Sequence, residues 1–332
     1  MATNPISRRA VIAAALAPWL TQSTGAQTAP STTGAFPNRA LRFIVPFPAG
    51  SISDVRTRSI TQKLADEWRQ QVLVDNRPGA TQTLGLDLAA RSAPDGYTIA
   101  MAPIAPLTIL PHLMKLPFDP LRDFVPITKV TSGPMLLVTQ ANAPFDTVAQ
   151  LIEQSRAKAG QFKVGGNGVG SLQHLATVLI GKSTGADLAH VPYQGGPQQI
   201  ADLVGGHIPL LLDFATILRP FLEAGKVKAL AVTNDKRLAN LPAVPTFEEL
   251  GHKGLHVIAW QGVVAPAATP PEIVASLHGA LVKALNMPDV RASVLNDGSE
   301  IGADSSEAFA AFIRAEHARW GKVIKDNAIT LG

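Results

Sequence analysis

The chain has 332 residues and a mass of 34.9 kDa, a length that suits two domains or one large one. Hydrophobic residues make up 46% of it and charged residues 16%, which excludes intrinsic disorder or a coiled coil for the whole chain. The absence of cysteine excludes catalytic thiols, disulfides and cysteine-ligated zinc, and a net charge of +4 without any basic run containing aromatics argues against nucleic acid as a partner.

The first 26 residues follow the order of regions in a signal peptide. Two adjacent arginines, Arg8 and Arg9, precede the apolar stretch Ala10–Leu20, and small and polar residues come next. This stretch is too short to cross a hydrocarbon core, which needs about 20 residues. The paired arginines favour the twin-arginine export route, with cleavage after Ala26. We therefore predict an exported protein whose mature chain starts with a flexible lead-in over residues 27–37.

Strands and helices alternate beyond the leader. Short β-branched and apolar runs that end at proline or glycine turns indicate strands, and apolar residues repeating at spacings near four indicate helices. Strands are predicted at Leu41–Val45, Gln71–Asp75, Tyr97–Met101, Phe124–Val130, Met135–Thr139, Phe162–Val164, Leu188–Val191, Leu210–Phe214, Lys228–Thr233 and Leu255–Ala265. Helices are predicted at Ser53–Trp68, Leu84–Ser92, Val148–Lys158, Leu172–Ser183, Pro197–Val204, Ile217–Ala224, Glu272–Leu285 and Ser306–Asp326.

This alternation predicts two α/β lobes, each built on a parallel sheet. The chain leaves the first lobe near Val138 and returns to it near Val263, so two strands are expected side by side as a hinge. The predicted boundaries are residues 38–138 with 263–332 for lobe 1 and 139–262 for lobe 2.

Two loops combine glycine with hydroxyl groups just before a predicted helix. They are Phe47–Asp54 and Gly165–Ser171. Ligands of open α/β sheets collect at the carboxyl ends of strands, where the free N–H groups and positive dipole end of a helix attract anions. The hydroxyls of Ser51, Ser53 and Ser171 add further donors. Together the loops have the chemistry of two clamps for a carboxylate.

The second loop has other interpretations. It lacks the third glycine of a dinucleotide fingerprint and the Gly-Lys-Ser/Thr ending of a phosphate-binding P-loop. A plain tight turn between strand and helix needs no ligand and would be preferred for this loop alone. The anion-binding interpretation is favoured because Phe47–Asp54 has matching chemistry.

A hydrolase could be built from Ser171 as nucleophile, His174 as base and Asp213 as orienting acid. Ser171 and His174 are, however, three residues apart at the start of one helix, and no Gly-x-Ser-x-Gly elbow is present. His174 is expected instead to form a structural hydrogen bond or to cap the loop. Asp54, near a helix start, is equally suited to stabilise the helix dipole and to accept a ligand ammonium, hydroxyl or water. The spacing of the histidines predicts no metal site.

Several short motifs occur in the order of one known family. They are Pro46–Gly50 with Asp54, Asp75–Ala80, Pro94–Thr98, Pro117–Pro120 with Asp123 and Phe124, Gly168–Ala176, His190–Gly195, Ala229–Thr233, Leu241–Thr246 and Trp260–Pro266. From about Phe36 to its C-terminus the chain resembles the tripartite tricarboxylate transporter substrate-binding proteins, also called Bug receptors. The resemblance implies a type II periplasmic binding protein, an α/β fold whose two lobes are joined by a two-strand hinge and close on a ligand in the cleft between them.

The resemblance also implies a function, a site and partners. The expected function is that of a periplasmic, non-enzymatic receptor for a small organic acid, without cofactor. The residues carried over by motif position are Phe47, Pro48, Ala49, Ser51, Asp54, Asn167, Gly168, Gly170, Ser171, His174, Tyr193, Asp213 and Trp260. The implied partners are the membrane subunits of a tripartite transporter or a sensor kinase, and a monomer is expected. The alternatives are an exported serine-dependent hydrolase that uses Ser171 and an interaction module with a vestigial cleft.

Departures from the family pattern bear on the ligand. Ser51 stands where glycine is usual, Gly166 where serine is frequent, and Ala80–Thr83 in place of a glycine-rich run. Ala102–Leu107 is almost wholly apolar where hydroxyl and amide side chains are common. The loss of hydroxyls predicts a monocarboxylate, or an acid with an aromatic or apolar tail, in preference to citrate.

Overall fold

The computed structural model describes residues 36–193, 196–295 and 299–331. The predicted signal peptide and nearly all of the predicted lead-in lie outside the described residues. Within the described ranges, no helix combines the length and the apolar character that a membrane span requires.

A parallel βαβαβ unit forms one half of the sheet. Its central strand β1 (Leu41–Val45) pairs in parallel with β2 (Val72–Asn76) on one side and β3 (Thr98–Pro103) on the other. The helices α1 (Ile52–Trp68) and α2 (Thr83–Ala90) connect these strands. The loop from β1 into α1 therefore lies at the carboxyl end of a central strand, as the alternation of elements predicts.

A second parallel group forms the other half. Strand β5 (Lys163–Asn167) lies between β7 (Leu210–Phe214) and β6 (Ala189–Tyr193) and pairs in parallel with both. The helices of this half are α3 (Val148–Ala157), α4 (Leu172–Thr184), α5 (Gly196–Gly205) and α6 (Ala215–Glu223). The glycine-rich loop from β5 into α4 thus also follows a central strand.

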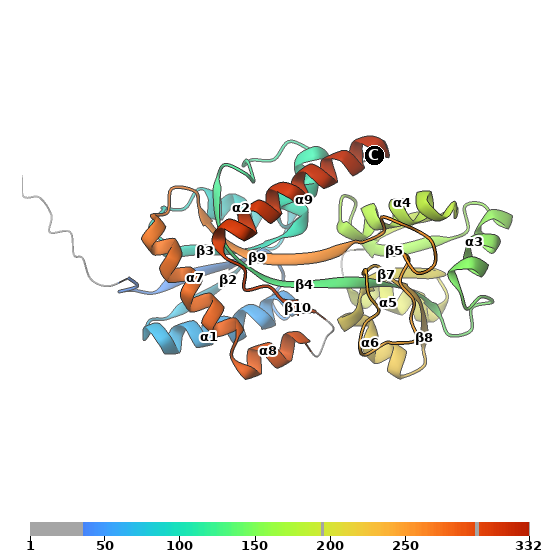
Figure 1. Cartoon of the computed structure of the whole chain (residues 1–332), viewed down its shortest axis with the longest axis horizontal. Helices are drawn as coiled ribbons and strands as arrows, with labels where there is room; N and C mark the ends of the chain where they lie inside the picture. The colour runs from blue at the N-terminus through green and yellow to red at the C-terminus, as the bar shows by residue number, and fades with distance from the viewer. Residues whose placement is uncertain (1–35, 194–195, 296–298, 332) are drawn as a thin grey trace, which may run out of the picture. The chain divides into compact units, whose positions relative to one another are not determined.

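Two long strands join the halves. β4 (Phe124–Gln140) pairs antiparallel with β9 (Ile258–Pro266) as far as Pro134. From Met135 onward it pairs instead with β7 and with β8 (Val227–Val232). β9 in turn pairs with β3. Figure 1 shows β4 and β9 running together between the two groups of helices. The sequence-based expectation of two connecting strands side by side is confirmed.

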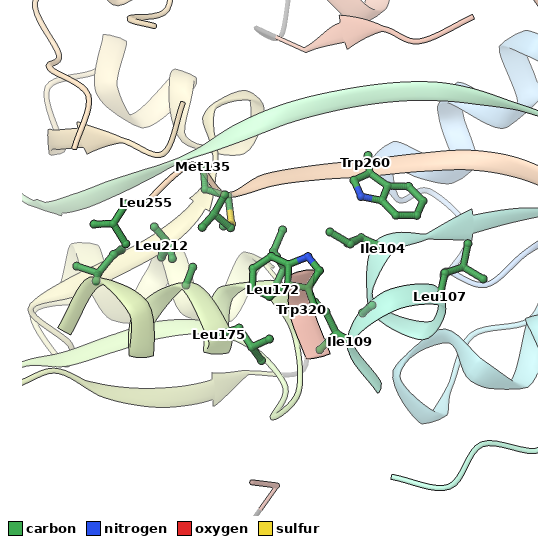
Figure 2. Close-up of a cluster of buried hydrophobic side chains, with 14 of the residues drawn as sticks. Ile104, Leu107, Ile109, Met135, Leu172, Leu175, Leu212, Leu255, Trp260 and Trp320 are labelled. Atoms are coloured by element: carbon green, nitrogen blue, oxygen red, sulfur yellow. The ribbon is translucent and has the colours of Figure 1, made fainter. Parts of the chain in front are cut away.

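The C-terminal part of the chain returns to the first half. It contains α7 (Pro271–Leu285), α8 (Pro288–Leu295), the short strand β10 (Glu300–Ile301), which pairs with β4, and α9 (Ser306–Asp326). One hydrophobic cluster contains residues from both halves (Figure 2). Among them are Ile109, Leu172 at the start of α4 and Trp320 of α9. Ile109 ends a short π-helical turn, Ala105–Ile109, and the 3-10 turn Leu110–His112 follows it.

The structure corrects the predicted strands at two places. Phe124–Val130 and Met135–Thr139 belong to one strand, β4. Pro134, which cannot donate a backbone hydrogen bond, is tolerated within it because it lies where β4 changes partners. β5 continues past Val164 to Asn167. A Cβ atom on Gly166 would lie 2.7 Å from the Cβ of Gln173, so the glycine permits close packing of β5 on α4 rather than forming a turn.

Candidate ligand-binding cleft

One cleft of about 1700 Å³ is lined by residues from both halves of the sheet and from the connecting strands. Its lining includes Ser51 at the start of α1 and Ser171 at the start of α4. The two loops predicted to hold a carboxylate therefore border a single cavity.

The first loop ends in a glycine followed by a capping serine. Gly50 has a φ of 79°, in the left-handed region where side chains are disfavoured. Ser51 is the N-cap of α1, and its Oγ accepts a hydrogen bond of 3.2 Å from the Asp54 N–H. Helix geometry leaves the N–H groups of Ile52 and Ser53 without intrahelical acceptors. These N–H groups are suited to an anion at the loop.

Asp54 holds the first loop and is absent from the cleft lining. Its Oδ2 accepts from the Gly50 N–H (2.8 Å) and from Arg58 Nε (3.0 Å), and its Oδ1 accepts from Asn76 Nδ2 (2.9 Å). Asn76 Nδ2 also donates to the Phe47 carbonyl at 3.1 Å. Burial acts to raise the pKa of Asp54, but the hydrogen bonds from Arg58, Gly50 and Asn76 outweigh it and the pKa lies below its ordinary value.

The second loop repeats this arrangement with different chemistry. Gly170 has a φ of 81°, and Ser171 caps α4 by accepting a hydrogen bond of 3.2 Å from the His174 N–H. Ser171 Oγ also donates to the Asn167 carbonyl at 3.0 Å. The Gly170 N–H donates to His174 Nδ1 at 3.2 Å, so the imidazole acts as the acceptor that Asp54 provides in the first loop. Burial lowers the pKa of His174.

Basic residues outnumber acidic ones in the cleft lining. Arg56 and Lys226 contribute to it, and Asp213 is its single acidic residue among those the structure describes. Burial raises the pKa of Asp213 to about 7, against the lowering effect of hydrogen bonds that include the Phe214 N–H to Oδ1 at 2.8 Å. Gln199 Nε2 donates to the other carboxyl oxygen, Oδ2. This balance of charge favours an anionic occupant.

Two aromatic residues of the lining, Tyr193 and Trp260, also have contacts outside the cleft. Tyr193 donates its hydroxyl proton to Asp202 Oδ2 at 2.7 Å, and burial together with this carboxylate raises the pKa of Tyr193 to about 12. Trp260 is 1% exposed and packs edge-on against Phe309 and Phe312. Both rings therefore have structural contacts besides the cleft.

The predicted site residues fall into two groups. The residues that line the cleft are Phe47, Pro48, Ala49, Ser51, Asn167, Gly168, Ser171, Tyr193, Asp213 and Trp260. Three predicted residues, Asp54, Gly170 and His174, do not line the cleft. Their hydrogen bonds hold the two loops: Asp54 accepts from Gly50, and His174 accepts from Gly170.

Sequence reasoning missed polar residues of the lining that lie outside the loops. Thr131 on β4 and Gln261 on β9 are cross-strand partners, and Gln173 lies in the first turn of α4. Gln261 Nε2 donates to Ser53 Oγ at 2.7 Å, which ties β9 to the start of α1. For Gln261 the available sequence signal was weak, a single amide side chain within the otherwise apolar strand β9.

The hydrolase triad is not assembled. The Ser171 hydroxyl contacts the backbone N–H of His174 and the Asn167 carbonyl, while the His174 ring accepts from Gly170. Asp213 bonds to Gln199 and to the Phe214 N–H. In the described part of the chain, no group of three or more His, Asp or Glu side chains is placed to hold a metal ion.

Residues 56–329 match the family model described as tripartite tricarboxylate transporter family receptor. The chain belongs to this family. It is accordingly a solute-binding receptor and not an enzyme, which excludes the hydrolase alternative.

Solved structures of similar proteins show the same fold. One described as Rpa4515 of R. palustris with adipate is 32% identical, covers 89% of this chain and 99% of its own, and has a TM-score of 0.81. The periplasmic binding protein BugD is 31% identical, with coverage of 89% and 99% and a TM-score of 0.79. MatC from Rhodopseudomonas palustris, with bound malate, is 30% identical, with coverage of 87% and 100% and a TM-score of 0.79. The chain has the α/β periplasmic binding protein fold of this family.

Proposed function

We propose that this receptor binds a small organic carboxylate between the loops Phe47–Asp54 and Asn167–Ser171. The observation that carries the proposal is that Ser51 and Ser171, the N-caps of helices from different halves of the sheet, line one cleft. Each helix start offers N–H groups and a positive dipole end to an anion. The similar receptors with adipate and with malate support a carboxylate as the ligand class.

The ligand is proposed to have an apolar segment. Pro103, Ile104 and Ala105 contribute an apolar wall to the cleft. Such a wall stabilises methylene or aromatic groups by about 25 cal/mol per Å² of apolar surface removed from water, but gives nothing to additional carboxylates. We therefore expect acids with aliphatic or aromatic bodies to bind more tightly than citrate.

Ligand binding is proposed to close two lobes about β4 and β9. The proposed lobes are residues 38–138 with 263–332 and residues 139–262. A ligand that contacts both serine loops has a higher affinity for the closed state and shifts the population toward it. The closed monomer would then be the form that binds the membrane subunits of a tripartite carrier. A sensor kinase is the second candidate partner.

Export is proposed to use residues 1–26 as a twin-arginine signal peptide. The paired residues Arg8 and Arg9 and the Ala10–Leu20 stretch support this route. Expression of the whole chain with Arg8 and Arg9 changed to Lys tests it. We expect the wild-type mature chain in the periplasm to begin near Gln27 by N-terminal sequencing and the double variant to stay in the cytoplasm; export of the variant would contradict the twin-arginine route.

Calorimetric titration of the mature protein tests the ligand class. Adipate, malate, benzoate and citrate are titrated into the wild type, Ser171→Ala and Thr147→Ala, because Thr147 caps α3 in the same way but does not line the cleft. We expect adipate or benzoate to bind more tightly than citrate, and Ser171→Ala alone to weaken binding. If citrate binds more tightly than adipate and benzoate, the ligand does not need an apolar segment and that proposal is wrong. If the three proteins bind each acid equally, Ser171 does not contribute to the site and the two-loop proposal is wrong.

A further inference from the structure

His190, on β6, lies behind the second loop and outside the cleft lining. Its Nε2–H donates to the Asn167 carbonyl at 2.8 Å, and the same oxygen accepts from Ser171 Oγ at 3.0 Å. Its Nδ1 is buried without a hydrogen-bond partner among the described residues. Because a carbonyl only accepts, the proton of the neutral ring is on Nε2. His190 therefore fixes the point where β5 ends and the loop begins.

His174 fixes the other end of the same loop. Its Nδ1 accepts from the Gly170 N–H at 3.2 Å, which requires that Nδ1 carry no proton. The two imidazole rings are neighbours, with centroids 4.9 Å apart and planes tilted by 34°. A Cβ on Gly166 would lie 2.9 Å from His190 Cε1, so the ring is packed closely against β5. Two adjacent imidazoles thus hold the two ends of the loop Asn167–Ser171.

We propose that His190 and His174 are positioning residues that keep the loop Asn167–Ser171 in its anion-binding form only while both rings are neutral, so that carboxylate affinity falls in acid. The proposal rests on the proposed function, because the loop lines the proposed ligand cleft. A proton on His174 Nδ1 would face the Gly170 N–H and remove its acceptor. A proton on His190 Nδ1 would place a charge in a buried position without a partner.

The surroundings of the pair favour the neutral rings. The titratable groups on the elements packed around it are Lys163 on β5, Lys182 on α4, Tyr193 on β6, Asp202 on α5 and Asp213 on β7. Among the described groups, His174 is the one whose charge acts on His190. Burial, and then the charge of His174, lower the pKa of His190 to about 4, although the bond to the Asn167 carbonyl acts to raise it. Burial also lowers the pKa of His174.

Glutamine variants separate titration from hydrogen bonding. In His190→Gln the amide can still donate to the Asn167 carbonyl, and in His174→Gln the amide oxygen can still accept from Gly170, but neither side chain takes up a proton. His278→Gln is the matched control, because His278 Nε2 also donates to a backbone carbonyl, that of Asp304, at 2.9 Å and on α7 of the other half. Each variant can keep the hydrogen bond of the histidine that it replaces, a donor bond at His190 and His278 and an acceptor bond at His174.

The first experiment is calorimetric titration with adipate from pH 8 to pH 4.5. Adipate takes up protons in this range too, so each variant is compared with the wild type at the same pH. We expect the wild type and His278→Gln to lose roughly three- to tenfold more affinity on acidification than His174→Gln, the equivalent of one hydrogen bond. The difference from His190→Gln should stay below about twofold at pH 4.5, because a pKa of about 4 keeps most His190 rings neutral there. Parallel profiles for all four proteins, or a wild-type affinity that rises relative to the variants in acid, would overturn the proposal.

A second measurement on the ligand-free protein separates this proposal from the proposed function. The Gly170 amide resonance and the ring nitrogens of both histidines are followed by ¹⁵N NMR over the same pH range. We expect the Gly170 amide to shift with the titration of His174 in the wild type and to stay constant in His174→Gln. A Gly170 amide shift that does not change when His174 is protonated would overturn the positioning role. Failure of adipate to bind at any pH, with the amide shift intact, would count against the proposed function alone.

Discussion

The two ligand loops have nearly the same backbone but are held by different chemistry. In each, a glycine with φ near 80° precedes a serine that caps a helix, and the serine N–H donates to the carbonyl three residues earlier, at 3.2 Å for Ser51 and 3.0 Å for Ser171. The side chain three residues after the serine then accepts from the glycine N–H. That acceptor is the carboxylate of Asp54 in one loop and the imidazole of His174 in the other.

The same backbone geometry should respond to pH differently in the two loops, because one is held by a carboxylate and the other by imidazole rings. Asp54 is stabilised as an anion by three donors, and its lowered pKa keeps it charged across the neutral and mildly acidic range. The loop held by His174 and His190 depends on neutral rings. The first loop should therefore keep its shape in conditions that release the second.

The largest expected effect is the pH dependence of stability that His190 introduces. Its folded pKa of about 4 lies below the unfolded value of 6.5, so the unfolded chain binds more protons between these limits. The contribution is present above pH 6.5 and is lost as the pH falls toward 4, by up to ~3 kcal/mol. Urea unfolding at several pH values should show that His190→Gln loses less stability in acid than the wild type. Parallel stability curves for the two proteins would contradict the account.

Removal of the Asp54 side chain should destabilise the protein at every pH at which this carboxyl group is ionised. Asp54→Ala leaves the Gly50 N–H and the Asn76 amide without their acceptor, which costs about 2 kcal/mol. The wild-type contribution is present above about pH 4, the unfolded pKa, and is lost only as the pH falls below it. Urea unfolding at pH 7 provides the measurement. Asp87→Ala, which removes an exposed pair with Arg91, is the control and should change stability by less than about 0.5 kcal/mol.

Loss of a capping serine should reduce stability as much as loss of the cap at Thr147. Only the serine variants should also weaken ligand binding. Ser51→Ala, Ser171→Ala and Thr147→Ala each remove an N-cap acceptor, and each should reduce the free energy of unfolding by about 1 kcal/mol. Thermal unfolding and adipate titration on the same samples give both quantities. Only the two serine variants should weaken adipate, by roughly tenfold. A similar loss of affinity in Thr147→Ala would show that the effect is general destabilisation.

The smallest expected effects distinguish the surroundings of the two glycines. Gly50→Ala should cost about 0.5–1 kcal/mol through its positive φ, because nothing lies within 4 Å of the added Cβ. Gly160→Ala, with a φ of 75° and equally open space, is the control. Gly170→Ala should cost more, since its Cβ would lie 3.0 Å from side-chain atoms of Leu110 and Leu331. Chemical denaturation gives the loss of unfolding free energy for the three variants. Equal losses would show that the side chains of Leu110 and Leu331 move aside without cost.

The alternation of strands and helices could be read from the sequence because each element has its own periodicity and its own turn. The joining of two predicted strands into β4 could not, because Pro134 resembles a break until its position at the change of partners is known. Helix α8 was also missed. It follows α7 after a gap of two residues and begins at Pro288, so it gave no separate signal.

The site was predictable where its residues are local. Ser51 and Ser171 stand beside glycine at the start of a helix, a pattern visible in any one segment. The contact between His174 and His190, or between Gln261 and Ser53, joins residues from separate elements and has no local signal. Motif order supplied the family, but only the assembled fold shows which side chains line the cleft and which hold its loops.

A crystal structure of the mature protein with adipate would show whether one carboxylate is held jointly by the two loops. We expect one adipate carboxylate within hydrogen-bond distance of groups at the start of both α1 and α4, directly or through an ordered water. An adipate that contacts the loop at Ser51 or the loop at Ser171, but never both, would contradict it.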